Sequence, residues 1–124
     1  MKEGFIMLDI NKMRENQASV KEGLEYDNVH DFDDLQMDEI RRGLIYGLNV
    51  SVYAKPELSW KQMEEIRLGL IYGLDVSVYA KPEFDNQQME EIRKGLANGL
   101  NVSVYAKPEL SWKQMEEIRR GLPR

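Results

Sequence analysis

The sequence predicts an all-α protein, a short helical-repeat solenoid with one long and one short helix in each 26-residue repeat. Three observations lead to this class. A methionine recurs every 26 residues before a Glu/Asp-Glu-Ile-Arg run, a helix-start signature precedes each methionine, and helically spaced apolar residues follow it. Repeats of this length bury their apolar faces by stacking on their neighbours. The methionines are Met37, Met63, Met89 and Met115.

The composition divides the chain into two parts. We interpret residues 1–36 as a degenerate acidic N-terminal capping unit and residues 37–124 as tandem repeats that end in a truncated last helix. The first part holds nine Asp and Glu against four Lys and Arg, whereas the second holds thirteen of each. Terminal units of repeat proteins present a polar outer face, which fits the acidic first part.

Each long helix is expected to begin at a capping box. In this motif the cap side chain accepts a hydrogen bond from the backbone three residues on, and a glutamine there accepts one from the cap backbone. Ser59 and Gln62 have this spacing, and a large apolar residue before the cap pairs with the methionine after it as in a hydrophobic staple. These signals place the long helices near residues 34–46, 60–72, 86–98 and 112–121.

The body and the end of each helix are also indicated by spacing. Met63, Ile66 and Leu70 lie on one helical face, and Gly73 is expected to stop the helix in a left-handed conformation. Gly69 lies inside the helix, where glycine costs roughly 1 kcal/mol relative to alanine, and it recurs in every repeat. We expect a neighbouring backbone to approach closely there, with a helix kink as the alternative.

The segment 75–80 between two long helices permits two interpretations. Val76, Val78 and Ala80 alternate as in a β-strand, which would make each repeat a strand–helix pair. Asp75 is, however, a natural helix cap, and the connection from the preceding glycine is short. We favour a short helix, while the strand stays open as the alternative.

Aromatic residues recur at fixed positions of the repeat. Tyr79 lies in a repeated Tyr-Ala-Lys-Pro-Glu segment, and we expect this side chain to pack between repeats with its hydroxyl bonded to a partner. Trp60 and Trp112, at the first position of their helices, are expected to cover the seam between repeats. The tyrosine recurs as Tyr53 and Tyr105.

The paired glutamates of each repeat could suggest acid–base chemistry. Neighbouring residues of a helix diverge by about 100°, so Glu64 and Glu65 do not face one site. We expect them to form an exposed face that pairs with an arginine of the same helix, and their negative charge near the helix N-terminus interacts favourably with the helix dipole. The equivalent pairs are Glu90 and Glu91, and Glu116 and Glu117.

Several classes of function are excluded or disfavoured by composition. The chain contains no cysteine, and no apolar run approaches the ~18 residues of a membrane span, so we expect a cytoplasmic protein without thiolate chemistry. The repeats are neutral overall, which makes nucleic acid an unlikely partner. His30 lies among aspartates, but the calcium-loop glycine and glutamate are missing, so we expect no metal and no cofactor.

The repeated segment Gly-Leu-Asn/Asp-Val-Ser-Val-Tyr-Ala-Lys-Pro-Glu, followed by Gln-Met-Glu-Glu-Ile-Arg, resembles a known kind of repeat. Tandem repeats of about this length occur in uncharacterised proteins of low-GC Gram-positive bacteria, often linked with mobile elements. The resemblance covers residues 37–124 and implies an intracellular bacterial origin. It implies no catalytic activity.

The positions that vary between near-identical repeats indicate a candidate partner-binding strip. The pair at 45–46 and the pair at 71–72 are both Ile-Tyr, whereas Ala97 and Asn98 occupy the equivalent positions of the next repeat. Tolerance of such different residues favours exposure, although packing on the next short helix is the alternative. We expect a non-enzymatic scaffold that binds a protein partner or a second copy of itself, with a nucleic-acid accessory role as the alternative. The candidate residues are Ile45, Tyr46, Ile71 and Tyr72.

Overall fold

α-Helices and short 3-10 helices make up the regular structure of residues 31–124, the part of the chain that the computed structural model describes. No β-strand occurs in that part, so the predicted all-α class is confirmed. The chain divides into two compact units, unit 1 (residues 1–63) and unit 2 (residues 64–124), which are described separately below. His30 and most of the expected capping unit 1–36 lie outside the described residues.

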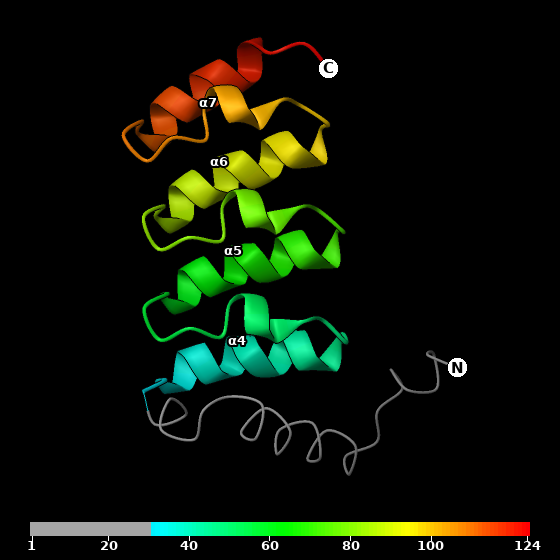
Figure 1. Ribbon diagram of the computed structural model, residues 1–124, viewed down its shortest axis with the longest axis vertical. Helices are drawn as coiled ribbons and strands as arrows, with labels where there is room; N and C mark the ends of the chain where they lie inside the picture. The colour runs from blue at the N-terminus through cyan, green and yellow to red at the C-terminus, as the bar shows by residue number, and fades with distance from the viewer. Residues whose placement is uncertain (1–30) are drawn as a thin grey trace, which may run out of the picture. The chain divides into compact units, whose positions relative to one another are not determined.

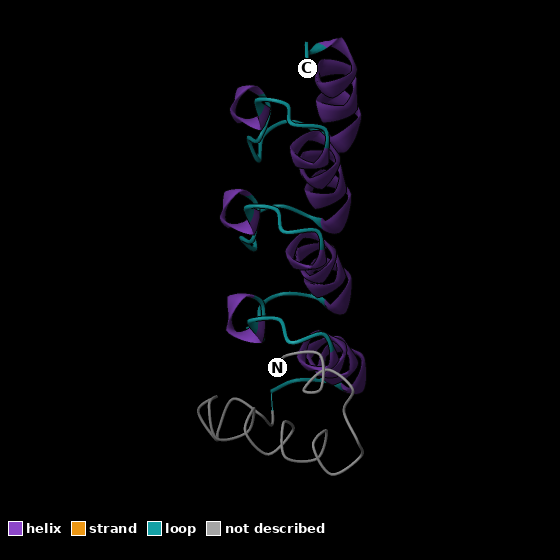
Figure 2. Ribbon diagram, turned by 90° about the vertical axis from the view of Figure 1, so that its right-hand side faces the viewer, coloured by secondary structure: helices purple, strands orange, loops and turns teal. Residues whose placement is uncertain are grey.

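Long and short helices alternate along the chain (Figure 1). In unit 2 the short helices lie in one layer and the α-helices in another, and α6 packs against both α7 and η3 (Figure 2). The predicted long helices are correct to within one residue at each end. Unit 1 contains α4 (Asp34–Ile45), η1 (Val50–Val52) and the first turn of α5 (Trp60–Ile71), and unit 2 contains the rest of α5, η2 (Val76–Val78), α6 (Asn86–Ala97), η3 (Val102–Val104) and α7 (Trp112–Gly121).

All four long helices begin at the predicted capping boxes. At α4 the backbone N–H of Gln36 donates to Asp33 Oδ1 at 2.7 Å, and the backbone N–H of Asp33 donates to Gln36 Oε1 at 2.8 Å. At α5 the same reciprocal pair joins Ser59 and Gln62, with distances of 2.8 and 3.1 Å. The equivalent pairs at α6 and α7 are Asp85 with Gln88 and Ser111 with Gln114.

Three of the long helices end at a glycine in the left-handed conformation, as predicted. After α4, Gly47 has φ 73°, its N–H donates to Leu44 O at 2.9 Å, and the N–H of Leu48 donates to Gly43 O at 2.9 Å. These two bonds form a Schellman motif, which satisfies carbonyls that the helix end would otherwise leave unpaired. Gly73 and Gly99 have φ values of 72°.

The segment that permitted two interpretations is helical in each repeat. Val76–Val78 form the single 3-10 turn η2, and Asp75 caps it by accepting hydrogen bonds from the backbone N–H and the hydroxyl of Ser77. An Asx cap of this kind offers the backbone a local turn in place of a strand ladder. The β-strand alternative is therefore wrong for this segment.

The core consists of the periodic apolar residues and the repeated tyrosines. Met63, Met89 and Met115 are fully buried, as are Ile66 and Ile92. Most of the apolar residues before the caps are buried as well, in agreement with the staple spacing, although Leu110 and Met37 are only half-buried. The other large side chains that are fully buried belong to Ile40, Tyr53, Leu58, Tyr79, Phe84 and Tyr105.

The length and hydropathy of the helices bear on whether the chain could span a membrane. Among the described residues, none of the helices combines the length and the apolar character that crossing a lipid bilayer requires.

Candidate functional site

The candidate strip residues lie at the C-terminal ends of α4 and α5. In unit 1, Ile45 is 36% and Tyr46 57% exposed; in unit 2, Ile71 is 38% and Tyr72 66% exposed. Each pair immediately precedes a left-handed glycine, so the Schellman motif fixes the backbone beneath it. A role of these side chains in partner binding stays a prediction.

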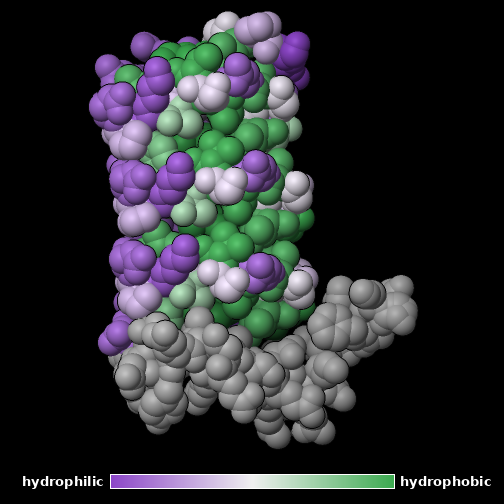
Figure 3. Space-filling view, in the orientation of Figure 1, coloured by the Kyte–Doolittle hydropathy of each residue, from purple (hydrophilic) through white to green (hydrophobic). Residues whose placement is uncertain are grey.

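Apolar surface is not restricted to these pairs. The face in view in Figure 3 carries apolar side chains in each unit, and polar side chains gather along the edge where the long helices begin. In unit 2, Val104 of η3 is 42% exposed as well. Single exposed apolar residues are ordinary on protein surfaces, so adjacent pairs such as Ile71 and Tyr72 are the more informative feature.

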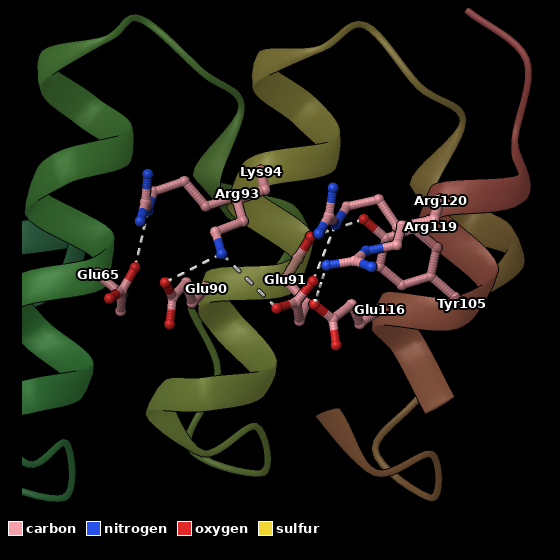
Figure 4. A network of polar contacts seen from close by, with 9 residues as sticks. All are labelled: Glu65, Glu90, Glu91, Arg93, Lys94, Tyr105, Glu116, Arg119 and Arg120. Carbon is pink, nitrogen blue, oxygen red and sulfur yellow. Dashed lines mark hydrogen bonds and ion pairs between the residues drawn. The ribbon is translucent and has the colours of Figure 1, made fainter. Parts of the chain in front are cut away.

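Partly buried ion pairs connect successive helices of unit 2 (Figure 4). Arg93 Nε in α6 donates to Glu65 Oε1 in α5 at 2.7 Å, and Arg119 Nε in α7 donates to Glu91 Oε1 in α6 at 2.8 Å. Glu91 is only 3% exposed. We expected these glutamates to form an exposed face paired within their own helix, and that expectation is wrong, because their partners lie 28 residues further along the chain.

The electrostatics of the first pair reflect a balance between burial and attraction. Burial raises the pKa of the Glu65 carboxyl above 4.5, although the hydrogen bond and the charge of Arg93 oppose the rise. Burial lowers the pKa of the Arg93 guanidinium, but the hydrogen bond and the charge of Glu65 outweigh it, so that pKa is raised. Attraction thus keeps Arg93 charged, whereas it offsets only part of the desolvation of Glu65.

In α6 and α7 the first glutamate of each pair lies beside a basic residue of its own helix, as expected, although that residue is four positions on and in α6 is a lysine. Lys94 Nζ lies 3.3 Å from Glu90 Oε2, and Arg120 Nη2 lies 2.9 Å from Glu116 Oε2, in both cases across one turn of a single helix. These pairs are exposed to solvent and contribute little to stability, ~0–1 kcal/mol each. In α6, Glu90 therefore pairs only within its own helix, whereas Glu91 also holds an arginine of the next helix.

The capping glutamines also connect successive repeats. Gln36 Nε2 donates to Pro56 O at 3.2 Å and to Leu58 O at 2.7 Å within unit 1. Gln88 Nε2 donates in the same way to the carbonyls of Pro108 and Leu110 in unit 2, at 3.0 and 2.6 Å. One amide therefore starts its own helix through its oxygen and holds the loop before the next helix through its nitrogen.

The repeated tyrosines and the intrahelical glycines occupy the same place. Tyr105 Oη donates to the backbone O of Glu91 at 2.7 Å and lies over Gly95, where an added Cβ would overlap the hydroxyl. Burial raises the pKa of Tyr105 to about 12. We expected a neighbouring backbone to approach this glycine closely, and that expectation is wrong in its partner, because the atoms that approach belong to side chains. The same arrangement joins Tyr53 to Gly43 and Tyr79 to Gly69.

The tryptophans at the helix starts are half-buried and lie beside lysines. Lys61 Nζ is 5.7 Å from the centroid of the Trp60 ring, and Lys113 Nζ has the same distance from the Trp112 ring. These distances fit cation–π contacts. The expected position of the rings over a seam between repeats stays a prediction.

Residues 31–124 contain no cluster of three or more His, Cys, Asp or Glu side chains that could hold a metal ion. The groups that the structure brings together are carboxylates neutralised by arginines and glutamine amides bonded to carbonyls, and this arrangement holds elements in place. Comparisons with protein-family models, with curated proteins and with solved structures returned no match to this chain.

Proposed function

We propose that this protein is a non-enzymatic scaffold for protein–protein interaction, in which helical repeats form a short solenoid and present Ile–Tyr pairs to a partner. The observation that carries the proposal is the exposure of adjacent large apolar side chains on a fixed backbone. Tyr72 is 66% exposed, whereas the repeated tyrosines of the core are fully buried. Tyrosine is enriched at protein interfaces because it offers apolar area together with a polar tip.

The repeat contacts within each unit support the solenoid. Gln36 and Gln88 make the same pair of bonds to the next loop, and Tyr53 and Tyr105 make the same bond to the preceding helix. When one contact pattern recurs at a fixed sequence period, neighbouring repeats stack in one geometry. We also propose, from the sequence resemblance, that the protein is intracellular and bacterial.

The third repeat shows which residues can replace the strip without disturbing the fold. The equivalents of Ile71 and Tyr72 in α6 are Ala97 and Asn98, and α6 has the same length as α5 and the same left-handed glycine after it. Replacing Ile71 and Tyr72 by Ala and Asn, and Ile45 and Tyr46 likewise, therefore removes the strip with residues that this helix end already accepts.

The experiment is quantitative affinity capture from a lysate of the source cells with wild type and this four-residue variant. We expect at least one protein to be captured by wild type and lost with the variant, and we expect the converse variant, Ala97→Ile with Asn98→Tyr, to capture at least as much of it. An identical set of captured proteins for all three baits would show that the strip is not the contact surface.

The alternative function, a nucleic-acid accessory role, draws less support from the described residues. It requires basic side chains that are free to neutralise phosphates. Arg93 and Arg119 are engaged by Glu65 and Glu91 in unit 2. Salt-dependent binding to DNA would favour this alternative over the scaffold.

A further inference from the structure

The last helix, α7, repeats the surface by which α6 holds the segment that follows it. The six residues from Gln114 to Arg119 are identical to those from Gln88 to Arg93. Both helices begin at a capping box, in which the glutamine Oε1 accepts from the cap N–H at 2.8 Å. The amide nitrogen of Gln114 is therefore oriented as that of Gln88 is.

Three residues of α6 make the contacts to the next repeat. The amide of Gln88 donates to two carbonyls, Glu91 accepts from an arginine through its carboxylate and from a tyrosine hydroxyl through its backbone, and Gly95 leaves room for that tyrosine. Together they recognise two carbonyl acceptors, a cation and a tyrosine in a fixed arrangement. The partners are Pro108 and Leu110 for the amide, Arg119 for the carboxylate and Tyr105 for the backbone carbonyl and the glycine.

The equivalent residues of α7 are exposed. Gln88 and Glu91 are 6% and 3% exposed, whereas Gln114, Glu117 and Gly121 all lie on the surface. Within residues 31–124, Glu117 has no ion-pair partner, the amide nitrogen of Gln114 donates to no carbonyl, and a Cβ at Gly121 would meet no atom within 4 Å. The α7 face, defined by these three residues, is thus the α6 contact surface without an occupant.

We propose that the α7 face binds one further 26-residue repeat of the same pattern. The occupant follows from complementarity: the face offers an amide donor, a carboxylate and a side-chain-free helix surface in the arrangement that α6 already uses. A fitting segment carries Val-Ser-Val-Tyr-Ala-Lys-Pro at its start and Glu-Glu-Ile-Arg in its helix. Burial of a charged pair with complementary geometry supplies specificity for this segment over unrelated helices. The proposal does not depend on the Ile–Tyr strip.

The test is a titration of the full-length protein into a labelled synthetic peptide with the sequence of residues 99–124, followed by fluorescence anisotropy. We expect saturable binding. Glu117→Arg in the protein, or Arg119→Glu in the peptide, should each weaken it by about tenfold or more, because each places like charges together. Combining the two variants should restore binding, since the pair is then reversed but complementary.

Matched variants separate the α7 face from general charge effects. Glu83→Arg makes the same change of charge at an exposed loop position of unit 2, and it should leave peptide binding unchanged. Gly121→Leu fills the space for the tyrosine without changing charge and should abolish binding, and circular dichroism checks that both proteins are folded. Absence of saturable binding, or equal binding by wild type, Glu117→Arg and Gly121→Leu, would overturn the proposal. Neither result would bear on the proposed role of the Ile–Tyr strip.

Discussion

At the residue scale, the intrahelical glycines show how a locally unfavourable residue is retained. Glycine inside a helix costs roughly 1 kcal/mol relative to alanine. At Gly95 the missing side chain admits the hydroxyl of Tyr105, which reaches the backbone carbonyl of Glu91 at 2.7 Å. A buried hydroxyl without a partner would cost about 1–3 kcal/mol, so the exchange favours glycine.

This pairing predicts that a Gly→Ala substitution has different effects on stability at Gly95 and at Gly121. Gly95→Ala should destabilise the protein by about 1–3 kcal/mol, because its Cβ would overlap the Tyr105 hydroxyl and lie 2.6 Å from Val102 Cγ1. Gly121→Ala, where nothing lies within 4 Å, should leave stability unchanged or slightly higher. Urea unfolding of both variants measures the difference. If Gly95→Ala proves no less stable than Gly121→Ala, the tyrosine does not require the glycine.

At the element scale, the capping glutamines link the start of one helix to the loop that precedes the next. Gln88 Oε1 accepts from Asp85 N at 2.8 Å, while its Nε2 donates to Leu110 O at 2.6 Å. A glutamate at position 88 would keep the oxygen that accepts from the cap N–H. It would replace the amide donor by a carboxylate oxygen, which cannot donate to the Leu110 carbonyl. The two functions of the amide can therefore be separated by an isosteric change.

We predict that Gln88→Glu destabilises the protein by about 1–3 kcal/mol at neutral pH, because the carbonyls of Pro108 and Leu110 lose their donor. Gln114→Glu is the matched control: it has the same capping role and the same change of charge, but Gln114 is exposed. Thermal unfolding of the two variants at equal ionic strength gives the comparison. Equal losses of stability would mean that only the capping role matters.

Prediction of these elements from sequence was accurate where the determinants are local. The Ser59–Gln62 box depends on residues within one turn, and it is present as predicted. The Glu65–Arg93 pair depends on the register in which two helices pack, which no local spacing specifies, so sequence reasoning assigned Glu65 to an exposed face instead. The signal that could have revealed the pair is a glutamate followed 28 residues later by an arginine, a spacing that recurs between successive repeats.

At the scale of the whole molecule, the buried tyrosines make the free energy of unfolding fall as the pH becomes alkaline. Burial raises the pKa of Tyr105 from 10.0 to about 12, and it also raises the pKa of Tyr79. A phenol with a raised pKa in the folded state binds its proton more tightly there than in the unfolded chain. Its contribution to stability is therefore complete below pH 10.0 and is lost as the pH rises towards about 12.

The variant Tyr105→Phe tests this dependence. At neutral pH it should be less stable than wild type by about 0.5–1.5 kcal/mol, because the hydrogen bond to Glu91 is lost while the ring remains. Above pH 10.0 wild type should lose this advantage progressively, since only wild type must ionise the buried phenol. Chemical unfolding at a series of pH values measures the difference, in which effects of the other titrating groups cancel. A gap that stays constant with pH would contradict the prediction.

The joint between successive repeats of unit 2 is made of two different halves, and every full repeat carries both. One half holds the glutamine, glutamate and glycine of α6, and the other holds the tyrosine, loop carbonyls and arginine of the following segment. A gene coding for such joints can gain or lose a whole repeat by unequal crossing-over between near-identical copies and still encode matched halves at every junction. Array length is therefore free to drift during evolution, while the residues within each junction are not.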